Sequence, residues 1–157
     1  MPEEERQNLE RTRDERLQQA ALGLEQVRKS LEAKPKDKRT VVEQTYLRNA
    51  FFYLGDCAYA LRDFDGAIRA YTAARDHFPA DPASLVAMTQ IVNANLQRGD
   101  VKAALTANER AKRFFKSLPP EVWNDPNLPM SKQDWERWLD STEKLAQSQT
   151  LDHESPE

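Results

Sequence analysis

The sequence predicts an all-α protein. Large apolar residues recur at three- and four-residue intervals over most of the 157-residue chain, and no stretch alternates every second residue as a strand would. The chain has only four glycines, and its prolines separate the periodic stretches rather than interrupt them. We therefore expect one ordinary domain built from short antiparallel helix pairs.

Composition and charge argue against several classes of protein. Hydrophobic residues make up 39% of the chain and charged residues 31%, which suits helices with solvated outer faces. The net charge of −3, with acids and bases interleaved, gives no electrostatic case for nucleic acid or for an anionic membrane. No apolar run approaches the roughly 20 residues of a membrane span, and the N-terminus lacks the apolar core of a signal peptide.

The sequence leaves the compartment open between two expectations. As it stands, the sequence is expected to be cytoplasmic, and its single cysteine fits a reducing environment. If Met1 opens an excised fragment, an export signal removed from upstream would place the protein in the periplasm or the envelope.

Residues 1–39 are predicted to form a charged helix and a loop. The helix extends from about Glu3 to Ala33, and its first half is almost entirely charged. An apolar stripe follows, but it is too short to favour a coiled-coil arm, so we interpret the segment as a charged lead-in to a packed helix. The stripe consists of Leu17, Ala20, Ala21, Leu24, Val27 and Leu31.

Residues 40–118 are predicted to form two helix pairs. Thr40 and Glu43 have the spacing of a capping box at the start of the first helix. Asp65 is expected to cap the next helix, with Asp63 in the preceding turn, and Gly99 to end the third. The predicted helices are about Val41–Leu61, Asp65–Phe78, Ala83–Gln97 and Val101–Ser117.

Residues 119–147 are predicted to form an extended proline-rich connection and a capping helix, followed by a flexible tail over residues 148–157. Ser131 is the expected N-cap of this last helix. Its apolar stripe is interpreted as core, and Trp123 in the connection is the best candidate for an aromatic contact with a partner. The stripe consists of Trp135, Trp138, Leu139, Thr142 and Leu145.

The two helix pairs repeat each other when the sequence is shifted by about 37 residues. The superposed pairs are Phe51 on Met88, Leu54 on Ile91, Phe64 on Val101, Ala67 on Ala104 and Ala74 on Ala111. This pattern resembles the tetratricopeptide repeat family over roughly Arg48 to Leu118. The residues of the first repeat that carry the resemblance are Phe51, Leu54, Gly55, Ala58, Phe64, Ala67, Tyr71, Ala74 and Pro79.

The second repeat departs from the family pattern, with Val92 in place of Gly55 and Asn108 in place of Tyr71. The resemblance implies helix pairs stacked as a short right-handed solenoid, in which small residues such as Gly55 and Ala67 let helices approach closely. The junction "HFPADPAS" is also similar to loops of bacterial envelope proteins of this family. The chain would then be the C-terminal part of a larger bacterial scaffold.

The resemblance implies a concave groove that receives a partner peptide. Chaperone adaptors of the family carry basic residues there, but Phe52 and Thr89 stand where lysines would be needed, so binding of chaperone tails is not predicted. Solvated groove surface without a partner is the competing interpretation. The implied groove residues are Asn49, Phe52, Asp56 and Tyr59 in the first repeat and Val86, Thr89, Asn93 and Gln97 in the second.

Residues with catalytic or metal-binding chemistry are sparse. His77 and His153 are far apart and lack neighbouring ligands, and Cys57 has no histidine near it in sequence. We therefore expect no enzyme activity, no cofactor and no metal. Asn95 and Asn108 fall at positions that are usually packed, and we expect them to bond to each other or to an incoming ligand.

The sequence therefore predicts a non-catalytic scaffold that binds a protein or peptide partner. Two alternatives remain. The apolar edge of the first repeat and the N-terminal helix would pair with a second copy in a homodimer, or the chain would be a non-catalytic domain of a larger envelope or enzyme-associated protein.

Overall fold

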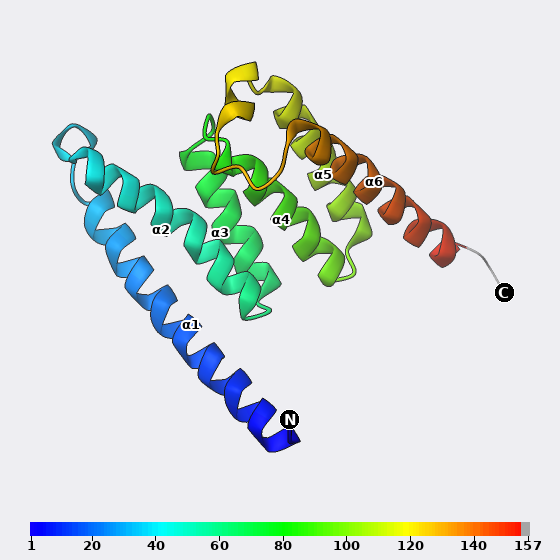
Figure 1. Cartoon of the computed structure of the whole chain (residues 1–157), viewed down its shortest axis with the longest axis horizontal. Helices are drawn as coiled ribbons and strands as arrows, with labels where there is room; N and C mark the ends of the chain where they lie inside the picture. Colours follow the sequence, from blue (N-terminus) through cyan, green and yellow to red (C-terminus); the bar gives the residue numbers. More distant parts are fainter. Residues whose placement is uncertain (155–157) are drawn as a thin grey trace. The chain divides into compact units, whose positions relative to one another are not determined.

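The computed structural model describes residues 1–154, with side chains described as far as Gln149 (Figure 1). It confirms the all-α prediction, and no strand occurs in that part of the chain. The chain divides into an N-terminal unit, Met1–Ala74, and a C-terminal unit, Arg75–Glu157. The helices are α1 (Glu3–Glu32), α2 (Val41–Ala60), α3 (Phe64–His77), α4 (Ala83–Gln97), α5 (Val101–Ser117) and α6 (Lys132–Glu154).

Two short 3₁₀ turns replace stretches that the sequence predicted as irregular. Lys36–Lys38 forms one turn inside the predicted polar loop, and Pro120–Asn124 forms the other inside the predicted extended connection. Proline at the start of the second turn already has the backbone angle that a helical turn needs. α6 continues to Glu154, into the stretch predicted as a tail, whereas residues 155–157 lie outside the described residues.

Most helix starts and ends follow the predicted capping chemistry. The capping box at Thr40 is confirmed: the Glu43 N–H donates to Thr40 Oγ1 at 3.1 Å, and the Thr40 N–H donates to Glu43 Oε2 at 2.8 Å. The prediction that Asp65 caps α3 is wrong. Asp63 does so, since its Oδ1 accepts the Gly66 N–H at 2.9 Å and the helix begins one residue before Asp65.

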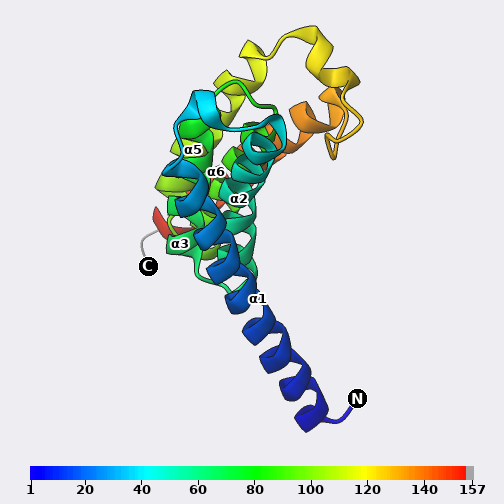
Figure 2. The same ribbon diagram turned by 90° about the vertical axis from the view of Figure 1, so that its left-hand side faces the viewer.

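The N-terminal unit opens with α1, whose N-terminal half extends past α2 (Figure 2). None of the residues of α1 is fully buried. The predicted apolar stripe is narrower than expected, because Ala20 is exposed and Val27 is 39% exposed. At the other end, the Lys34 ammonium bonds the Glu43 carboxylate at 2.8 Å, and Arg39 Nε donates to the Leu31 carbonyl at 2.7 Å. These contacts fix the turn from α1 into α2.

α2 and α3 pack closely because small residues line their interface. Ala67 and Ala74 on α3 are both 0% exposed. Gly55 on α2 lies against the ring of Tyr71, where an added Cβ would come within 2.5 Å of two ring carbons. The Tyr71 hydroxyl donates to Asp56 Oδ1 at 2.5 Å. The close approach that the sequence predicted at Gly55 and Ala67 is therefore present.

The C-terminal unit is built from α4, α5 and α6, which share one hydrophobic core. The helix predicted to cap the chain contributes two nearly buried side chains to it, Trp135 and Leu139. The predicted stripe is wrong at Leu145, which is 53% exposed, while Ala146 is 1% exposed in its place. The core consists of Leu85, Met88, Ala111, Phe115, Trp135 and Leu139.

Candidate functional site

α2 carries the first four predicted groove residues on one helix face, since they are spaced by three, four and three residues. Phe52 is 8% exposed, and the Arg48 guanidinium lies over its ring, 5.2 Å from the centroid. The same guanidinium donates to Asn49 Oδ1 at 3.0 Å. Tyr59 meets Phe64 edge to face, with ring centroids 5.4 Å apart. This half of the candidate site is held in place by its neighbours.

α4 carries the other four predicted residues on one face. Thr89 is 5% exposed, and its hydroxyl donates to the Val86 carbonyl at 2.8 Å. Asn93 Nδ2 donates to Gln90 Oε1 at 2.9 Å. Gln97 is exposed at the last residue of the helix. Val86 packs against the core of the C-terminal unit.

The polar groups left over on these two faces are few. Among the described residues, the amide nitrogen of Asn49 and the Oδ1 of Asn93 have no hydrogen-bond partner. The same is true of both polar atoms of the Gln97 amide. An amide can donate to and accept from an extended backbone at once. Phe52 and Thr89 leave little area for a partner because both are nearly buried. The two faces belong to different units, and each is described by itself.

The sequence pattern did not reveal the role of Arg48. Its guanidinium covers Phe52 and bonds Asn49, so it shapes the α2 face although it is not among the predicted groove positions. An arginine one turn before an aromatic residue on a helix is the signal that would have indicated this contact.

The two buried asparagines of the C-terminal unit each bond to a backbone carbonyl, so the expected bond between them is wrong. Asn95 Nδ2 donates to the Ile91 carbonyl of its own helix at 2.9 Å. Asn108 Nδ2 donates across to the Leu139 carbonyl of α6 at 3.0 Å. Asn108 Oδ1 is buried and has no partner among the described residues. Asn108 therefore ties α5 to α6.

We expect Asn108→Leu to stabilise the chain by about 1 kcal/mol. Losing the bond to Leu139 costs about 1 kcal/mol, but removing a buried oxygen without a protein partner returns about 1–3 kcal/mol. Urea unfolding followed by circular dichroism measures the difference. Asn95→Leu is the matched control, since it removes a bond within one helix and no buried unpaired atom, and we expect no gain from it. A clearly destabilised Asn108→Leu would contradict this balance, because the bond to Leu139 or the fit of the amide would then outweigh the cost of the buried oxygen.

The cysteine and the histidines lie at separate positions, and the environment of Cys57 disfavours its reactive form. Burial, and secondarily the Asp56 carboxylate, raise the pKa of the Cys57 thiol, so its reactive thiolate is disfavoured. His77 ends α3 with its ring 6.4 Å from that of Phe78, and the side chain of His153 lies outside the described residues. Among the described residues, no three of His, Cys, Asp and Glu gather as metal ligands do.

Other sequence motifs have structural roles. Arg98, Gly99 and Asp100 form the turn between α4 and α5: Gly99 has a φ of 78°, and Asp100 Oδ1 accepts the Ala103 N–H at 2.9 Å. Trp123, the candidate partner contact, is half-buried, with its ring centroid 5.1 Å from that of Phe115. Within the described residues, no helix combines the length and apolar character needed to cross a bilayer.

Lys112 joins α5 to α6 through two carboxylates. Its ammonium bonds Glu143 and lies 3.0 Å from Asp140 Oδ1. These partners, Glu143 first, raise the pKa of Lys112 above its ordinary value of 10.5. A raised pKa in the folded state means that the charged form stabilises folding at every pH below the unfolded value. This stabilisation is lost as the pH rises through the folded pKa.

We therefore expect the stability difference between the wild type and Lys112→Met to stay constant from neutral pH to about 10, and to shrink at higher pH. The free energy of urea unfolding, measured for both proteins across this range, gives the difference at each pH. Lys144→Met, on an exposed residue of α6 without an ion-pair partner among the described residues, is the control. A difference that does not change above pH 10.5 would contradict the assignment.

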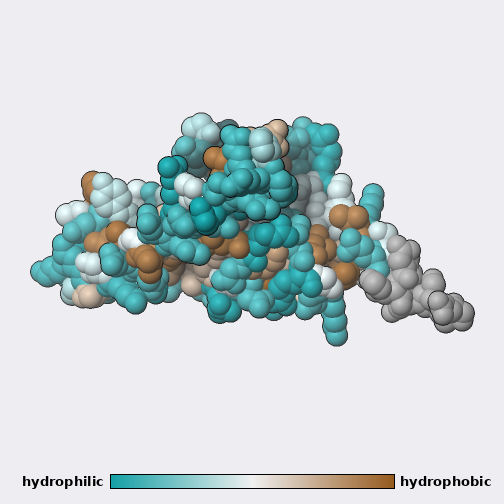
Figure 3. All heavy atoms as spheres, turned by 90° about the horizontal axis from the view of Figure 1, so that it is seen from below, coloured by the Kyte–Doolittle hydropathy of each residue, from teal (hydrophilic) through white to brown (hydrophobic). Residues whose placement is uncertain are grey.

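The N-terminal unit also has an apolar hollow of about 470 Å³ between α1, α2 and α3. Leu54, Ala58 and Leu61 form its α2 side. At its edge, Arg28 bonds Glu25 at 2.5 Å and lies 5.5 Å from the centroid of the Phe51 ring. Apolar residues also reach the surface between polar ones on the face drawn in Figure 3. The volume falls within the range that proteins use for ligands.

Comparison of the chain with protein-family models, with curated proteins and with solved structures gives no match.

Proposed function

We propose that the chain is a non-catalytic interaction module of the tetratricopeptide type, in which the exposed face of α2 and the exposed face of α4 each contact a partner protein. The observation that carries the proposal is the repetition of the packing. Ala67 and Ala104 are both 0% exposed, and so are Ala74 and Ala111, one repeat apart. Residues that repeat at buried positions build a scaffold, and a scaffold leaves its outer faces free for partners.

The chemistry of each face favours a partner segment in extended conformation. Asn49, Asn93 and Gln97 offer amide groups that match the donors and acceptors of an extended backbone. Tyr59 adds an aromatic surface of low conformational entropy. The absence of lysines at positions 52 and 89 means that a free C-terminal carboxylate is not the main determinant.

A displayed library of random peptides, selected on the immobilised full chain, tests this proposal. We expect an enriched sequence whose binding shifts the side-chain amide NMR signals of Asn49, Asn93 and Gln97. Replacing these three residues by alanine should weaken binding at least tenfold. The matched control replaces three exposed amides of α1, Gln18, Gln19 and Gln26, and should bind as the wild type does.

Two outcomes would contradict the proposed groove. One is a selection that enriches no peptide. The other is an enriched peptide that shifts the NMR signals of Trp123, or of helices other than α2 and α4, and that binds the triple alanine variant with full affinity. An enriched sequence that passes both tests then identifies candidate partners in the source proteome.

A second candidate function is self-association through the edge of α2. Val42, Tyr46 and Tyr53 lie on one face of this helix, and they are 57%, 59% and 51% exposed. Exposed aromatic residues on one face are typical of an interface. Light scattering over a range of concentrations tests this function: a dimer that Tyr46→Ser with Tyr53→Ser dissociates would support it, and a strict monomer would contradict it.

A further inference from the structure

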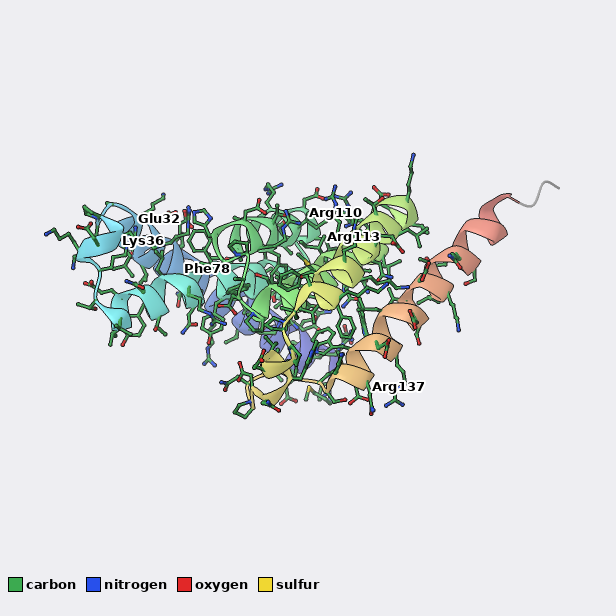
Figure 4. The ribbon with its side chains drawn as sticks, turned by 90° about the horizontal axis from the view of Figure 1, so that it is seen from above. Glu32, Lys36, Phe78, Arg110, Arg113 and Arg137 are labelled. Carbon is green, nitrogen blue, oxygen red and sulfur yellow. The ribbon has the colours of Figure 1, made fainter. Side chains whose placement is uncertain are left out.

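The outward face of α5 carries a stripe of positive charge. Lys102, Arg110, Arg113 and Lys116 are all exposed, and Figure 4 labels Arg110 and Arg113 near each other on this helix. At 100° per residue the four side chains fall within about 120° of the helix circumference. They span about 21 Å along the axis, at 1.5 Å per residue. Glu109 is the one carboxylate within this stripe.

None of the four cations has an ion-pair partner among the described residues. Lys112, one helical turn before Lys116, bonds two carboxylates of α6. Arg110 and Arg113 lie further round the helix from Lys112, by about 160° and 100°. Lys116, at the end of the stripe, also borders a small hollow of about 160 Å³ that Glu136 and Asp140 line. In the middle of the stripe, Glu109 is the neighbouring carboxylate on α5, and no ion pair joins it to Arg110 or Arg113 among the described residues.

The stripe has a net positive charge, whereas the chain as a whole has a net negative charge. The whole chain has a net charge of −3, so long-range attraction would not bring an anion to it. A local run of unpaired cations on one helix face complements a partner with carboxylates at similar spacing. The exposed residues of α5 include no large apolar side chain, which argues against insertion into a membrane surface.

We propose that the outward face of α5 docks an acidic segment of a partner protein. Arg110 and Arg113 hold carboxylates through paired N–H donors, and Lys102 and Lys116 bind the two ends of the segment as point charges. The residues of this surface differ from the amide-bearing residues of α2 and α4. The docking proposal can therefore be tested independently of the proposed peptide binding.

Fluorescence anisotropy with a labelled peptide of about ten glutamates tests the proposal. At about 0.01 M salt, where the Debye length is about 30 Å, we expect saturable binding to the full chain. Arg110→Glu with Arg113→Glu should weaken binding at least tenfold. Lys36→Glu with Lys38→Glu is the matched control, since it makes the same change in net charge at exposed residues of the N-terminal unit and should keep the wild-type affinity.

Three outcomes would overturn the proposal. The first is no binding of the glutamate peptide at low salt. The second is an equal loss in both double variants, which would reduce the effect to net charge. The third is tighter binding of a labelled DNA duplex, or of vesicles containing anionic lipid, than of the peptide, which would assign the stripe to a different class of partner. Circular dichroism of each variant checks that the fold is kept.

Discussion

Gly55→Ala is expected to lower the free energy of unfolding by about 1–2 kcal/mol. The new Cβ would lie 2.5 Å from two ring carbons of Tyr71 and 2.8 Å from a third, well inside contact distance. The ring cannot move aside easily, because Tyr71 is 1% exposed and its hydroxyl is bonded to Asp56. Overpacking of this kind costs typically 1–3 kcal/mol, and it outweighs the gain of about 1 kcal/mol in helix propensity.

Gly23→Ala is the matched control for this prediction. Gly23 also lies inside a long helix, but nothing comes within 4 Å of the Cβ that the change would add. Here the propensity gain is unopposed, and we expect a stabilisation of about 0.5–1 kcal/mol. Urea unfolding followed by circular dichroism measures both variants. If Gly55→Ala were as stable as Gly23→Ala, the close contact of Gly55 with the Tyr71 ring would be contradicted.

Helix bounds were predictable where local chemistry decides them. α4 and α5 begin and end at the predicted residues, because Pro82 precedes the first and Gly99 separates the two. Arg62 shows the limit of this reasoning. It ends α2 in the left-handed region at a φ of 61°, a role usually filled by glycine, so no sequence signal marked it.

The buried residues of a helix were predictable where the apolar spacing allows only one residue at a core position. They were less predictable at the ends of helices, where the spacing allows two. In α6 the spacing allowed either Leu145 or Ala146 to face the core, and the larger residue was the wrong choice. In α2 the apolar residues Val42 and Tyr46 keep the helical period but lie on a face that is exposed. Periodicity tells which residues share a face, but the packing of neighbouring helices decides which face is buried.

The candidate site was predictable as a set of positions but not as a set of contacts. The eight predicted groove residues come from a repeat pattern, and four of them lie on α2 and four on α4. Arg48 over Phe52 is a local contact within α2, which its spacing could have indicated, whereas Tyr71 reaches Asp56 from α3. The partner of Asn108 lies 31 residues away on α6. Contacts of that kind follow from tertiary packing and leave no trace in a single sequence.

Trp135→Ala is expected to have the largest effect on the C-terminal unit, a loss of about 3–5 kcal/mol. Trp135 is 2% exposed and belongs to the core shared by α4, α5 and α6. Removing its indole leaves a cavity that the surrounding helices fill only in part. Its ring centroid also lies 6.5 Å from that of Trp138 in an edge-to-face arrangement, and that contact is lost. Urea unfolding followed by far-ultraviolet circular dichroism measures the change without relying on tryptophan fluorescence.

Trp135→Phe separates the two parts of this effect. Phenylalanine keeps most of the buried ring but removes the indole N–H, which is buried and has no partner among the described residues. Because an unpaired buried donor costs about 1–3 kcal/mol, its removal offsets the smaller volume of the new side chain. We therefore expect Trp135→Phe to cost less than about 1.5 kcal/mol. If it were as destabilising as Trp135→Ala, the unpaired N–H would not be a significant cost, and the fit of the whole indole would be what holds α6 in the core.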